Sequence, residues 1–539
     1  MKRQFGFWLL SAFAVPWLTS SPAPAEQPQV QVFHEVQHGI SAPLRSLALH
    51  PPAVATPPVD LEEDEERPLH SAPAMEQDDP VWQQTVSGRL PTTPGLNLVG
   101  LGGGFTGPQG IFSYGFPPPD PNGSVGATQV LETVNLDIAV FNKTSGAVTL
   151  GPVKIATLWN DFSVSECSGA YLADPIVLYD KQAGRWLIKI VTITNSPNYY
   201  TCFAVSTTSD ATGKFYLYAF EQPGQGITTG QKLGVWPDAY YMSQWVFSTT
   251  YTGPQACALD RTSMLAGRTA TMQCFQITDP SIFGMLPSDL DGATLPPTGS
   301  PNYFLIQGPA KSNSLYMFQF HVDFTTPSNS TFTGPATISV APYASALADG
   351  TVSIPQPGTS NLLDANGSDL MPRLAYRNFP SATPPHESLV VTHSILVGTG
   401  SKARVGTRWY ELRSPGATPV VYQEGTYSPD TTYRWMGSIA MDKVGNIALG
   451  YTASSSTIYP SMRYTGRLST DKLNSMAPEA TIMAGSGAQM VSGRWGDYTS
   501  MSVDPADDCI MWHIGEYMAG TGTLEWATKL FQFKFSSCK

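Results

Sequence analysis

Short runs of Val, Ile, Thr and aromatic residues recur along the chain, each bounded by Gly, Pro, Asn or Asp. Runs such as "PIVLYD" at 175–180 and "WLIKIV" at 186–191 have the length and the β-branched content of buried strands. Apolar positions at helical spacing are scarce, and charged residues make up only 13% of the chain, which is low for helices with solvated faces. The pattern predicts an all-β protein.

One phrase returns in altered form along the chain: a polar residue, a strand, a turn and a second strand. Its anchor positions are Asp174, Asp238, Arg373, Trp435 and Asp497. Successive anchors lie about 60 residues apart, or about twice that, and a fixed period of this size is typical of repeated sheet units. The repeat predicts one architecture built from similar sheets.

Two further phrases complete the series. "PPPDPNGSVGATQVLETV" around Asp120 precedes the first anchor, and "PNYFLIQ" near Asn302 lies in the longest interval. Seven such units predict a seven-bladed β-propeller of four-stranded antiparallel blades over residues 96–539. A pair of β-sandwiches is the alternative, and it would need a linker in the middle of the chain, where the sequence shows none.

The first 25 residues have the order of a secretory signal peptide. Lys2 and Arg3 precede the apolar run "FGFWLLSAFAVPWL", and Ala23-Pro24-Ala25 provides the small residues of a cleavage site. The apolar run is too short to span a bilayer, and no later stretch reaches about 18 uninterrupted apolar residues. We therefore expect a secreted protein, extracellular or periplasmic, with no membrane span.

Residues 26–95 differ in character from the rest of the chain. They are rich in Pro and Ala, poor in aromatic residues, and contain the acidic run "DLEEDEERP". Such a composition buries too little apolar surface to offset the entropy lost on ordering. We expect a disordered linker or pro-segment here, in front of the propeller.

Six cysteines suit an exported chain, because an even number allows all of them to pair. The spacing favours three local bridges: Cys167 with Cys202, Cys257 with Cys274, and Cys509 with Cys538. Metal binding is the alternative, but no two cysteines stand two to four residues apart as zinc ligands usually do. The sequence leaves the connectivity itself open.

The formal net charge of −12 lies largely in residues 26–95, so the predicted propeller is only mildly acidic. A mildly acidic surface argues against nucleic acid as a main partner. The remaining candidates are a carbohydrate or another cell-surface ligand, and we expect the protein to be a monomer.

In a propeller the loops that enter the innermost strands surround one end of the central channel, the mouth. Equivalent positions of different blades therefore meet at the mouth although they lie far apart in the sequence. The polar anchors expected there include both carboxylates and guanidinium groups: Asp120, Asp174, Asp238, Arg373, Arg434, Arg494 and Asp497. A polarised pocket at the mouth is the predicted site.

The chain resembles the secreted sialidase-like, BNR-type propellers, a group that includes glycoside hydrolases. The resemblance rests on the predicted architecture and on "SPDTTYRW" at 428–435, which matches the repeated Asp-box loosely; the aromatic-Arg-Ile-Pro signature is absent. It implies that three arginines bind a substrate carboxylate, that a Tyr with a Glu partner is the nucleophile, and that an Asp is the acid or base. Residues available for these roles are Arg373, Arg434 and Arg494, Tyr517 with Glu516, and Asp174 or Asp238.

The chemistry of glycoside cleavage points to the same positions. It needs two carboxyl groups on opposite sides of one bond, one protonated and the other ionised. Asp174, Asp238 and Asp497 are the candidates. Each of them has an alternative structural role, because an Asp at the start of a strand often caps a turn.

Tryptophans next to these anchors are candidates for stacking against sugar rings. They are Trp236, Trp435 and Trp495. Packing between blades is the alternative for all three. Ion pairing with neighbouring acids is the corresponding alternative for Arg434 and Arg494.

Asp120 and Asn122 in "PPDPNG" carry the closely spaced oxygens that calcium prefers, and exported proteins meet calcium. A plain turn is the alternative. We expect no required cofactor and consider a structural calcium at this turn.

Two functions fit the sequence. The first is a secreted carbohydrate-active hydrolase that uses carboxylates at the mouth of the propeller. The second is a non-catalytic propeller that binds glycan or protein at the same place.

Overall fold

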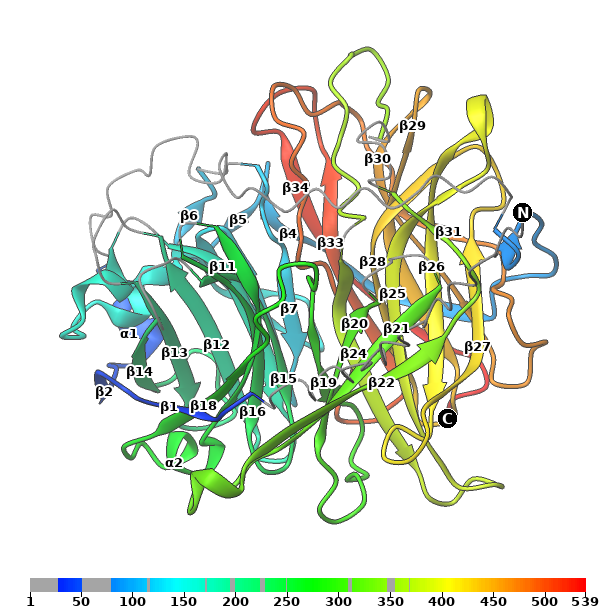
Figure 1. Ribbon diagram of the computed structural model, residues 1–539. Coiled ribbons are helices and arrows are strands. Elements are labelled where there is room, and N and C mark those ends of the chain that lie inside the picture. Colours follow the sequence, from blue (N-terminus) through cyan, green and yellow to red (C-terminus); the bar gives the residue numbers. More distant parts are fainter. Residues whose placement is uncertain are drawn as a thin grey trace, which may run out of the picture.

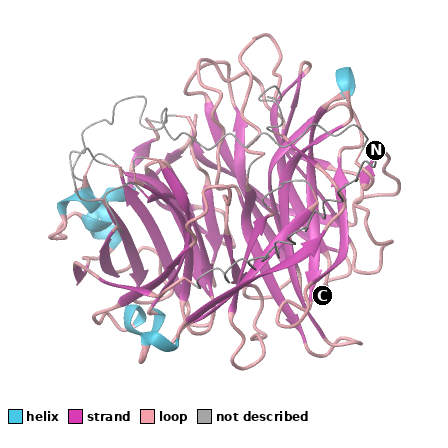
Figure 2. Cartoon of the chain, in the orientation of Figure 1, coloured by secondary structure: helices cyan, strands magenta, loops and turns pink. Residues whose placement is uncertain are grey.

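The computed structural model describes residues 28–50, 79–113, 117–169, 172–193, 199–222, 228–248, 250–308, 313–346, 354–367 and 369–539. The predicted signal peptide lies outside the described residues. Strands dominate the described part (Figure 2). Its two α-helices are α1 (Leu44–Leu47) and α2 (Arg261–Leu265), and neither is long enough to cross a membrane. The prediction of an all-β chain is confirmed.

Antiparallel strands that follow one another in the sequence form most of the sheets. The first sheet contains β7 (Asn122–Val125), β8 (Gln129–Val134), β9 (Asp137–Asn142) and β10 (Val148–Lys154). The next is β11 (Leu172–Asp180), β12 (Arg185–Thr192), β13 (Tyr200–Ser206) and β14 (Phe215–Glu221). It is followed by β15 (Thr228–Val235), β16 (Tyr240–Phe247), β17 (Tyr251–Leu259) and β18 (Thr271–Gln276).

A ten-stranded sheet follows, in which two antiparallel runs are joined by the parallel pair β19–β24. One run is β19 (Leu286–Leu290), β20 (Asn302–Gln307), β21 (Ser314–His321) and β22 (Thr331–Ser339). The other is β24 (Leu370–Phe379), β25 (His386–Val397), β26 (Arg404–Arg413) and β27 (Val420–Tyr427), with the short β23 (Ala344–Ser345) paired to β25. A separate two-stranded sheet of β5 (Thr106–Gly107) and β6 (Gly110–Ile111) contacts β10.

The last two sheets contain the C-terminal strands. One is β28 (Tyr433–Met441), β29 (Ile447–Ser455), β30 (Ile458–Arg467) and β31 (Ala480–Met483). The other is β32 (Ser500–Val503), β33 (Ile510–Met518), β34 (Trp526–Phe535) and, from the N-terminal side, β4 (Thr92–Gly102). The β4–β34 pairing therefore brings a strand from the N-terminal side and the last strand of the chain into one sheet (Figure 1).

The first strands of these runs contact one another in a closed cycle. In order, the cycle is β7, β11, β15, β19, β24, β28, β32 and back to β7. Each of the other strands lies progressively farther from this cycle as its sheet extends outward. Segments that enter the first strands are consequently brought to one end of the cycle, although they are far apart in the sequence.

A bulge recurs near the beginning of four of the first strands. The pairing of each with its second strand shifts register between Ala173 and Ile176, Thr229 and Lys232, Met371 and Ala375, and Trp435 and Ser438. The backbone at three of these bulges has a positive φ: 54° at Asp174, 61° at Gly230 and 50° at Met436. A bulge redirects the side chain that it contains, so equivalent bulges aim equivalent positions at the same end of the cycle.

Part of the segment expected to be disordered is paired with the sheets, which corrects that expectation. β1 (Gln31–His34) extends the sheet at β18, and β2 (Gln37–Ile40) extends the neighbouring sheet at β14 (Figure 1). β3 (Trp82–Gln83) pairs with β27, and β4 begins at Thr92. Composition missed these strands because they bury few side chains and are held by backbone hydrogen bonds to exposed sheet edges. The acidic run itself lies outside the described residues.

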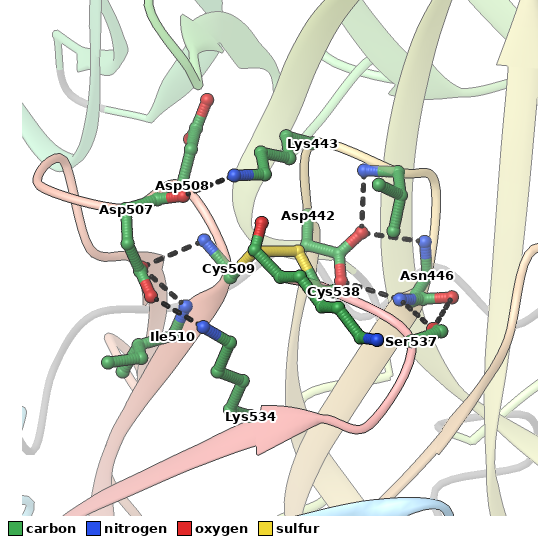
Figure 3. The surroundings of a disulfide bond; sticks show 12 residues. Asp442, Lys443, Asn446, Asp507, Asp508, Cys509, Ile510, Lys534, Ser537 and Cys538 are labelled. Atoms are coloured by element: carbon green, nitrogen blue, oxygen red, sulfur yellow. Dashed lines mark hydrogen bonds and ion pairs between the residues drawn. A yellow bond between two sulfur atoms is a disulfide. The ribbon is translucent and has the colours of Figure 1, made fainter.

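All three predicted disulfides are present: Cys167–Cys202, Cys257–Cys274 and Cys509–Cys538. The third joins the beginning of β33 to the segment after β34 (Figure 3). Asp507 supports this junction, since its carboxylate accepts hydrogen bonds from the Cys509 and Ile510 amides and from Lys534 Nζ (Figure 3). The bridge thus holds β34 in place for its pairing with β4.

We predict that removing the Cys509–Cys538 bridge lowers stability more than removing the Cys257–Cys274 bridge. The first closes a chain separation of 29 residues and the second only 17, between residues already opposite on paired strands. Each bridge contributes about 2 to 4 kcal/mol, more for the longer loop. Thermal unfolding of the two double Cys→Ala variants measures the difference, and an equal or opposite order would contradict it.

A buried carboxyl group also connects the first sheet to the sheet that contains β4. Glu132 on β8 is fully buried, and its Oε2 accepts a hydrogen bond from the Leu101 amide at 2.9 Å. The Thr528 hydroxyl donates to Leu101 O at 2.8 Å and lies within hydrogen-bond distance of Glu132 Oε1. One hydroxyl proton serves both contacts only if Glu132 holds a proton of its own. Burial raises the pKa of Glu132 to about 8, which favours that protonated form.

We predict that Glu132→Gln flattens the dependence of stability on pH. The folded pKa is above the unfolded one, so the contribution of Glu132 is complete below about pH 4.5 and is lost as pH rises to about 8. Each pH unit in this window costs about 1.4 kcal/mol. Glutamine reproduces the hydrogen bonds of the protonated acid. Denaturant unfolding from pH 5 to 8 tests this, with exposed Glu221→Gln as the control; an unchanged slope in Glu132→Gln would refute it.

Candidate functional site

Acidic side chains meet where the chain enters the first strands. Asp120 precedes β7, Asp174 lies in the bulge of β11, Asp369 precedes β24, and Asp497 precedes β32. Together with Glu516 of β33 and two cationic side chains they form the mouth cluster: Asp120, Asp174, Asp369, Asp497, Glu516, Lys232 and Arg494. Of these, the sequence predicted Asp120, Asp174, Asp497, Glu516 and Arg494.

Asp120 lies at the centre of this cluster and is 1% exposed. Its Oδ2 accepts a hydrogen bond from Asn135 Nδ2 at 2.8 Å, and its Oδ1 accepts one from the Asp497 amide at 3.3 Å. Burial raises the pKa of Asp120 well above its usual value, and the negative charges of Asp497 and Asp174 raise it further, against the opposing charge of Arg494. The surroundings of the Asp120 carboxyl group therefore favour its protonated form.

Glu516 is fully buried beside Asp120 and Asp497. Its Oε2 accepts a hydrogen bond from the Gly496 amide at 3.0 Å, whereas its Oε1 has no hydrogen-bond partner among the described residues. Burial raises the pKa of Glu516 well above its usual value, and the negative charge of Asp497 adds to the effect. The cluster thus contains a second carboxyl group whose surroundings favour the protonated form.

Lys232 and Arg494 supply the positive charge of the cluster. Arg494 Nη2 donates to Asp497 Oδ2 at 3.1 Å, and this pair is the most exposed part of the cluster. The Lys232 ammonium group lies 3.6 Å from the centre of the Tyr498 ring. Burial lowers the pKa of Lys232, while Asp497 and Asp174 raise it. Lys232 is on β15, directly after the bulge that contains Gly230.

Asp174 connects the bulges of neighbouring first strands. Its Oδ2 accepts hydrogen bonds from Thr229 Oγ1 at 3.3 Å and from the Gly230 amide at 3.2 Å. A side chain at position 230 would collide with Trp245, which lies 2.4 Å from the place of a Cβ atom. Glycine is therefore required at the bulge that binds Asp174, and Gly230 is the equivalent of Asp174 in β15.

Asp238 is not the equivalent of Asp174, contrary to the sequence alignment of the repeats. It lies in the exposed turn after β15, at the opposite end of that strand from Lys232 and Gly230. Its carboxylate accepts a hydrogen bond from the Tyr241 hydroxyl at 3.2 Å. The two positions were confused because in both "WPDAYY" and "ADPIVL" an aspartate is followed by apolar residues. Asp174 lies near the beginning of a first strand, whereas Asp238 follows the end of one.

Tyr517 and Glu516 do not act as a pair. Consecutive residues of a strand point to opposite faces of the sheet. Glu516 faces Gly496 and the mouth cluster, whereas Tyr517 is 5% exposed and packs in an apolar cluster with Phe531 and Met501. The implied nucleophile pair is therefore wrong for Tyr517.

Arg373 and Arg434 are committed to ion pairs inside the fold. Arg373 Nη2 donates to Asp291 Oδ1 at 2.9 Å, and its Nε donates to Asp289 Oδ2 at 2.5 Å. Burial raises the pKa of Asp291, but Arg373 and other cations outweigh it and hold the pKa at about 2. Arg434 is fully buried and pairs with Glu479 and Asp430. Of the three predicted arginines only Arg494 lies in the mouth cluster.

The three candidate tryptophans pack in the core. Trp236, Trp435 and Trp495 are each at most 1% exposed. Trp435 and Trp495 contact each other with ring centres 5.6 Å apart, and Trp236 packs edge-on against Tyr376 at 4.7 Å. Their rings have no surface on which a sugar could stack, so the packing alternative holds.

The turn considered for calcium uses its oxygens otherwise. Asn122 Oδ1 accepts a hydrogen bond from the Val177 amide at 2.7 Å, and Asn122 Nδ2 donates to Tyr498 O at 3.0 Å. Over the described ranges, no group of three or more His, Cys, Asp or Glu side chains is arranged to hold a metal ion. Calcium binding at Asp120 and Asn122 remains a prediction.

A narrow cavity runs along the axis of the cycle below the mouth cluster. Its walls include Lys232, Asp289, Arg373 and Tyr498, and its volume is about 40 Å³. A single buried water needs about 10 to 15 Å³, so the cavity has room for a few waters but not for a sugar ring. This cavity is therefore too small to hold a ligand of the mouth cluster.

Two members of the cluster were missed by the sequence analysis. Asp369 carried a signal, because it ends the polar stretch "LLDANGSD" directly before β24. Lys232 carried none, since "TTGQKLGV" reads as an ordinary strand with one lysine. Its position becomes meaningful only when the bulge of β15 is aligned with that of β11.

Neither a family model nor a curated protein matches this chain. Among solved structures, it aligns with the α-L-arabinofuranosidase Arb93A from Fusarium graminearum at 8% identity, covering 83% of this chain and 99% of that chain, with a TM-score of 0.34. The polysaccharide lyase Uly1 aligns at 10% identity over 84% and 99%, with a TM-score of 0.37. The Hadza microbial sialidase Hz136 aligns at 11% identity over 78% and 75%, with a TM-score of 0.34. Similarities this low do not decide the function.

Proposed function

We propose that residues 96–539 form a seven-bladed β-propeller. The closed cycle of first strands, the outward order of the strands in each run, and the pairing of β4 with β34 support this class of protein. We further propose that residues 1–25 are a signal peptide and that the protein is secreted. Three disulfides support an oxidising environment outside the cytoplasm.

Within this class, we propose a carbohydrate-active hydrolase whose reaction takes place at the mouth cluster. The observation that supports it is the coexistence of carboxyl groups in different protonation states. Burial and the negative charges of Asp497 and Asp174 favour the protonated form of Asp120. Pairs of acids whose surroundings push their pKa values apart are typical of general acid and general base catalysis.

The proposed reaction assigns one proton donor and one proton acceptor. Asp120 gives its proton to the oxygen of the leaving sugar as the glycosidic C–O bond breaks. A water molecule forms the new C–O bond, and its proton passes to Asp497 or Asp174. Return of that proton to Asp120 through solvent restores the enzyme. Arg494, which binds Asp497 and is partly exposed, positions the base and contacts substrate hydroxyl groups.

Non-catalytic carbohydrate binding at the same place is the second candidate. The small volume of the axial cavity favours it, because a ligand confined to the outer side of the cluster contacts fewer of the buried acids. The two candidates share the surface at Arg494 and differ in whether the buried carboxyl groups take part in a reaction.

We predict that Asp174→Asn and Asp497→Asn each lower kcat/KM for a susceptible glycoside by about 100-fold, as expected for loss of a general base or its neighbour. Asparagine tolerates the positive φ of residue 174, so the bulge is retained. Asp238→Asn is the matched control, because it removes the same charge from a turn at the opposite end of β15. A panel of chromogenic glycosides provides the measurement.

Two outcomes would contradict the proposed hydrolase activity. One is a folded wild-type protein that hydrolyses nothing on a broad panel. The other is loss of activity in Asp238→Asn equal to that in Asp497→Asn. A glycan-array signal that Arg494→Ala abolishes, without turnover, would instead support the binding protein.

A further inference from the structure

A second hollow lies between the sheet of β24 to β27 and the sheet of β28 to β31. We call it the distal pocket, because turns that follow β24 and β28 form part of its wall, at the strand ends opposite to the mouth cluster. Its volume is about 440 Å³. Pockets of about 300 to 1,000 Å³ accommodate small-molecule ligands. The distal pocket is thus large enough for a saccharide unit, unlike the axial cavity.

Positive charge dominates its lining although the chain as a whole is acidic. The ionised side chains at the pocket are Arg413, Lys443 and Arg467 against a single carboxylate, Glu411. Lys443 Nζ donates to Asp507 O at 3.2 Å and is otherwise on the exposed side. An excess of cationic groups around one hollow favours an anionic ligand.

The one carboxylate is fully engaged by its neighbours. Glu411 is 2% exposed and accepts hydrogen bonds from Ser388 Oγ at 2.8 Å, Arg413 Nε at 2.7 Å and Gln423 Nε2 at 2.6 Å. Arg413 uses only its Nε in this pair. The terminal amino groups of its planar guanidinium remain for a second partner, and a fork of two N–H donors matches a carboxylate.

Two buried polar atoms at the pocket lack partners within the described residues. Arg467 Nε is a donor and Gln423 Oε1 is an acceptor, and their side chains are 1% and 2% exposed. Buried polar groups nearly always have a hydrogen-bond partner. An unpartnered donor and an unpartnered acceptor in the wall of one pocket favour a ligand that both accepts and donates hydrogen bonds, as a hydroxylated anion does.

Aromatic rings complete the lining. The Tyr422 ring is 40% exposed, and the Arg413 guanidinium carbon lies 3.3 Å from its centre. Phe379 and His386 stack with ring centres 5.1 Å apart. Such rings offer an apolar face beside polar groups, which suits a ring with one apolar side and hydroxyl groups at its rim.

We propose that the distal pocket binds an acidic saccharide, with its carboxylate on Arg413, in the positive field of Lys443 and Arg467, and its ring against Tyr422. The cations favour the anion, the orphaned donor and acceptor favour hydroxyl groups, and the aromatic faces distinguish a sugar acid from a bare phosphate. This site is independent of the mouth cluster and of the reaction proposed there, because it lies at the other end of the same strands.

Ligand-observed NMR with D-glucuronate, D-glucose and inorganic phosphate tests the proposal on the full chain. We expect saturable binding of glucuronate in the millimolar range, at least about tenfold tighter than binding of glucose or phosphate, a difference of about 1.4 kcal/mol. Added salt should weaken it, because part of the attraction is between charges. No saturable binding of glucuronate, or equal binding of glucose or phosphate, would overturn the proposal.

Variants locate the binding. Arg413→Gln and Tyr422→Ser should each weaken glucuronate binding by about tenfold or more, the loss expected for one charged contact. Arg404→Gln is the matched control, since Arg404 also stacks on a ring, 4.7 Å from the centre of Trp82, but lies outside the pocket. Asp497→Asn should bind as the wild type does, which separates this site from the mouth cluster. Unchanged binding in folded Arg413→Gln, or equal losses in Arg404→Gln, would overturn the assignment.

Discussion

The pairing of β4 with β34 is the interaction on which the rest of the structure depends. It joins a strand from the N-terminal side to the last strand of the chain, so the sheets close on themselves. A disulfide behind β34 and the protonated carboxyl group of Glu132 hold the same junction from two sides. Closure leaves the first strands in contact all the way round, and only then do Asp120 and Asp497 come together across about 380 residues of sequence.

The order of residue types along the chain made the all-β fold and the three disulfides predictable. β-Branched runs with turns at a period of about 60 residues indicate repeated sheets, and the spacing of the cysteines suggests loops of modest length. Strands β1 and β2 could not be found in this way, because they have few buried side chains and depend on edges formed by β18 and β14. The composition of a segment indicates how much apolar surface it can bury, but it does not show which exposed sheet edge the segment pairs with.

The candidate site was only partly predictable, since it depends on which end of a strand a residue occupies. Asp174 and Asp238 look alike in the sequence, but one lies in a bulge at the beginning of a first strand and the other in the turn after one. The sequence also does not show which of the candidate side chains are buried. Trp435 and Arg434 lie at the beginning of a first strand, but both side chains are buried, and Arg434 pairs with Glu479. For Glu516, the alternation of side chains along β33 already separates it from Tyr517.

The proposed reaction requires that the mouth cluster hold carboxyl groups that are protonated at neutral pH beside ionised ones. Infrared spectroscopy of the folded protein at pH 7 tests it most directly, because protonated and ionised carboxyl groups absorb at different frequencies. We expect a protonated-carboxyl signal that Asp120→Asn and Glu516→Gln each reduce and that substitution of an exposed carboxylate, Glu221→Gln, leaves unchanged. A spectrum in which neither of the first two variants changes the protonated-carboxyl signal would contradict it.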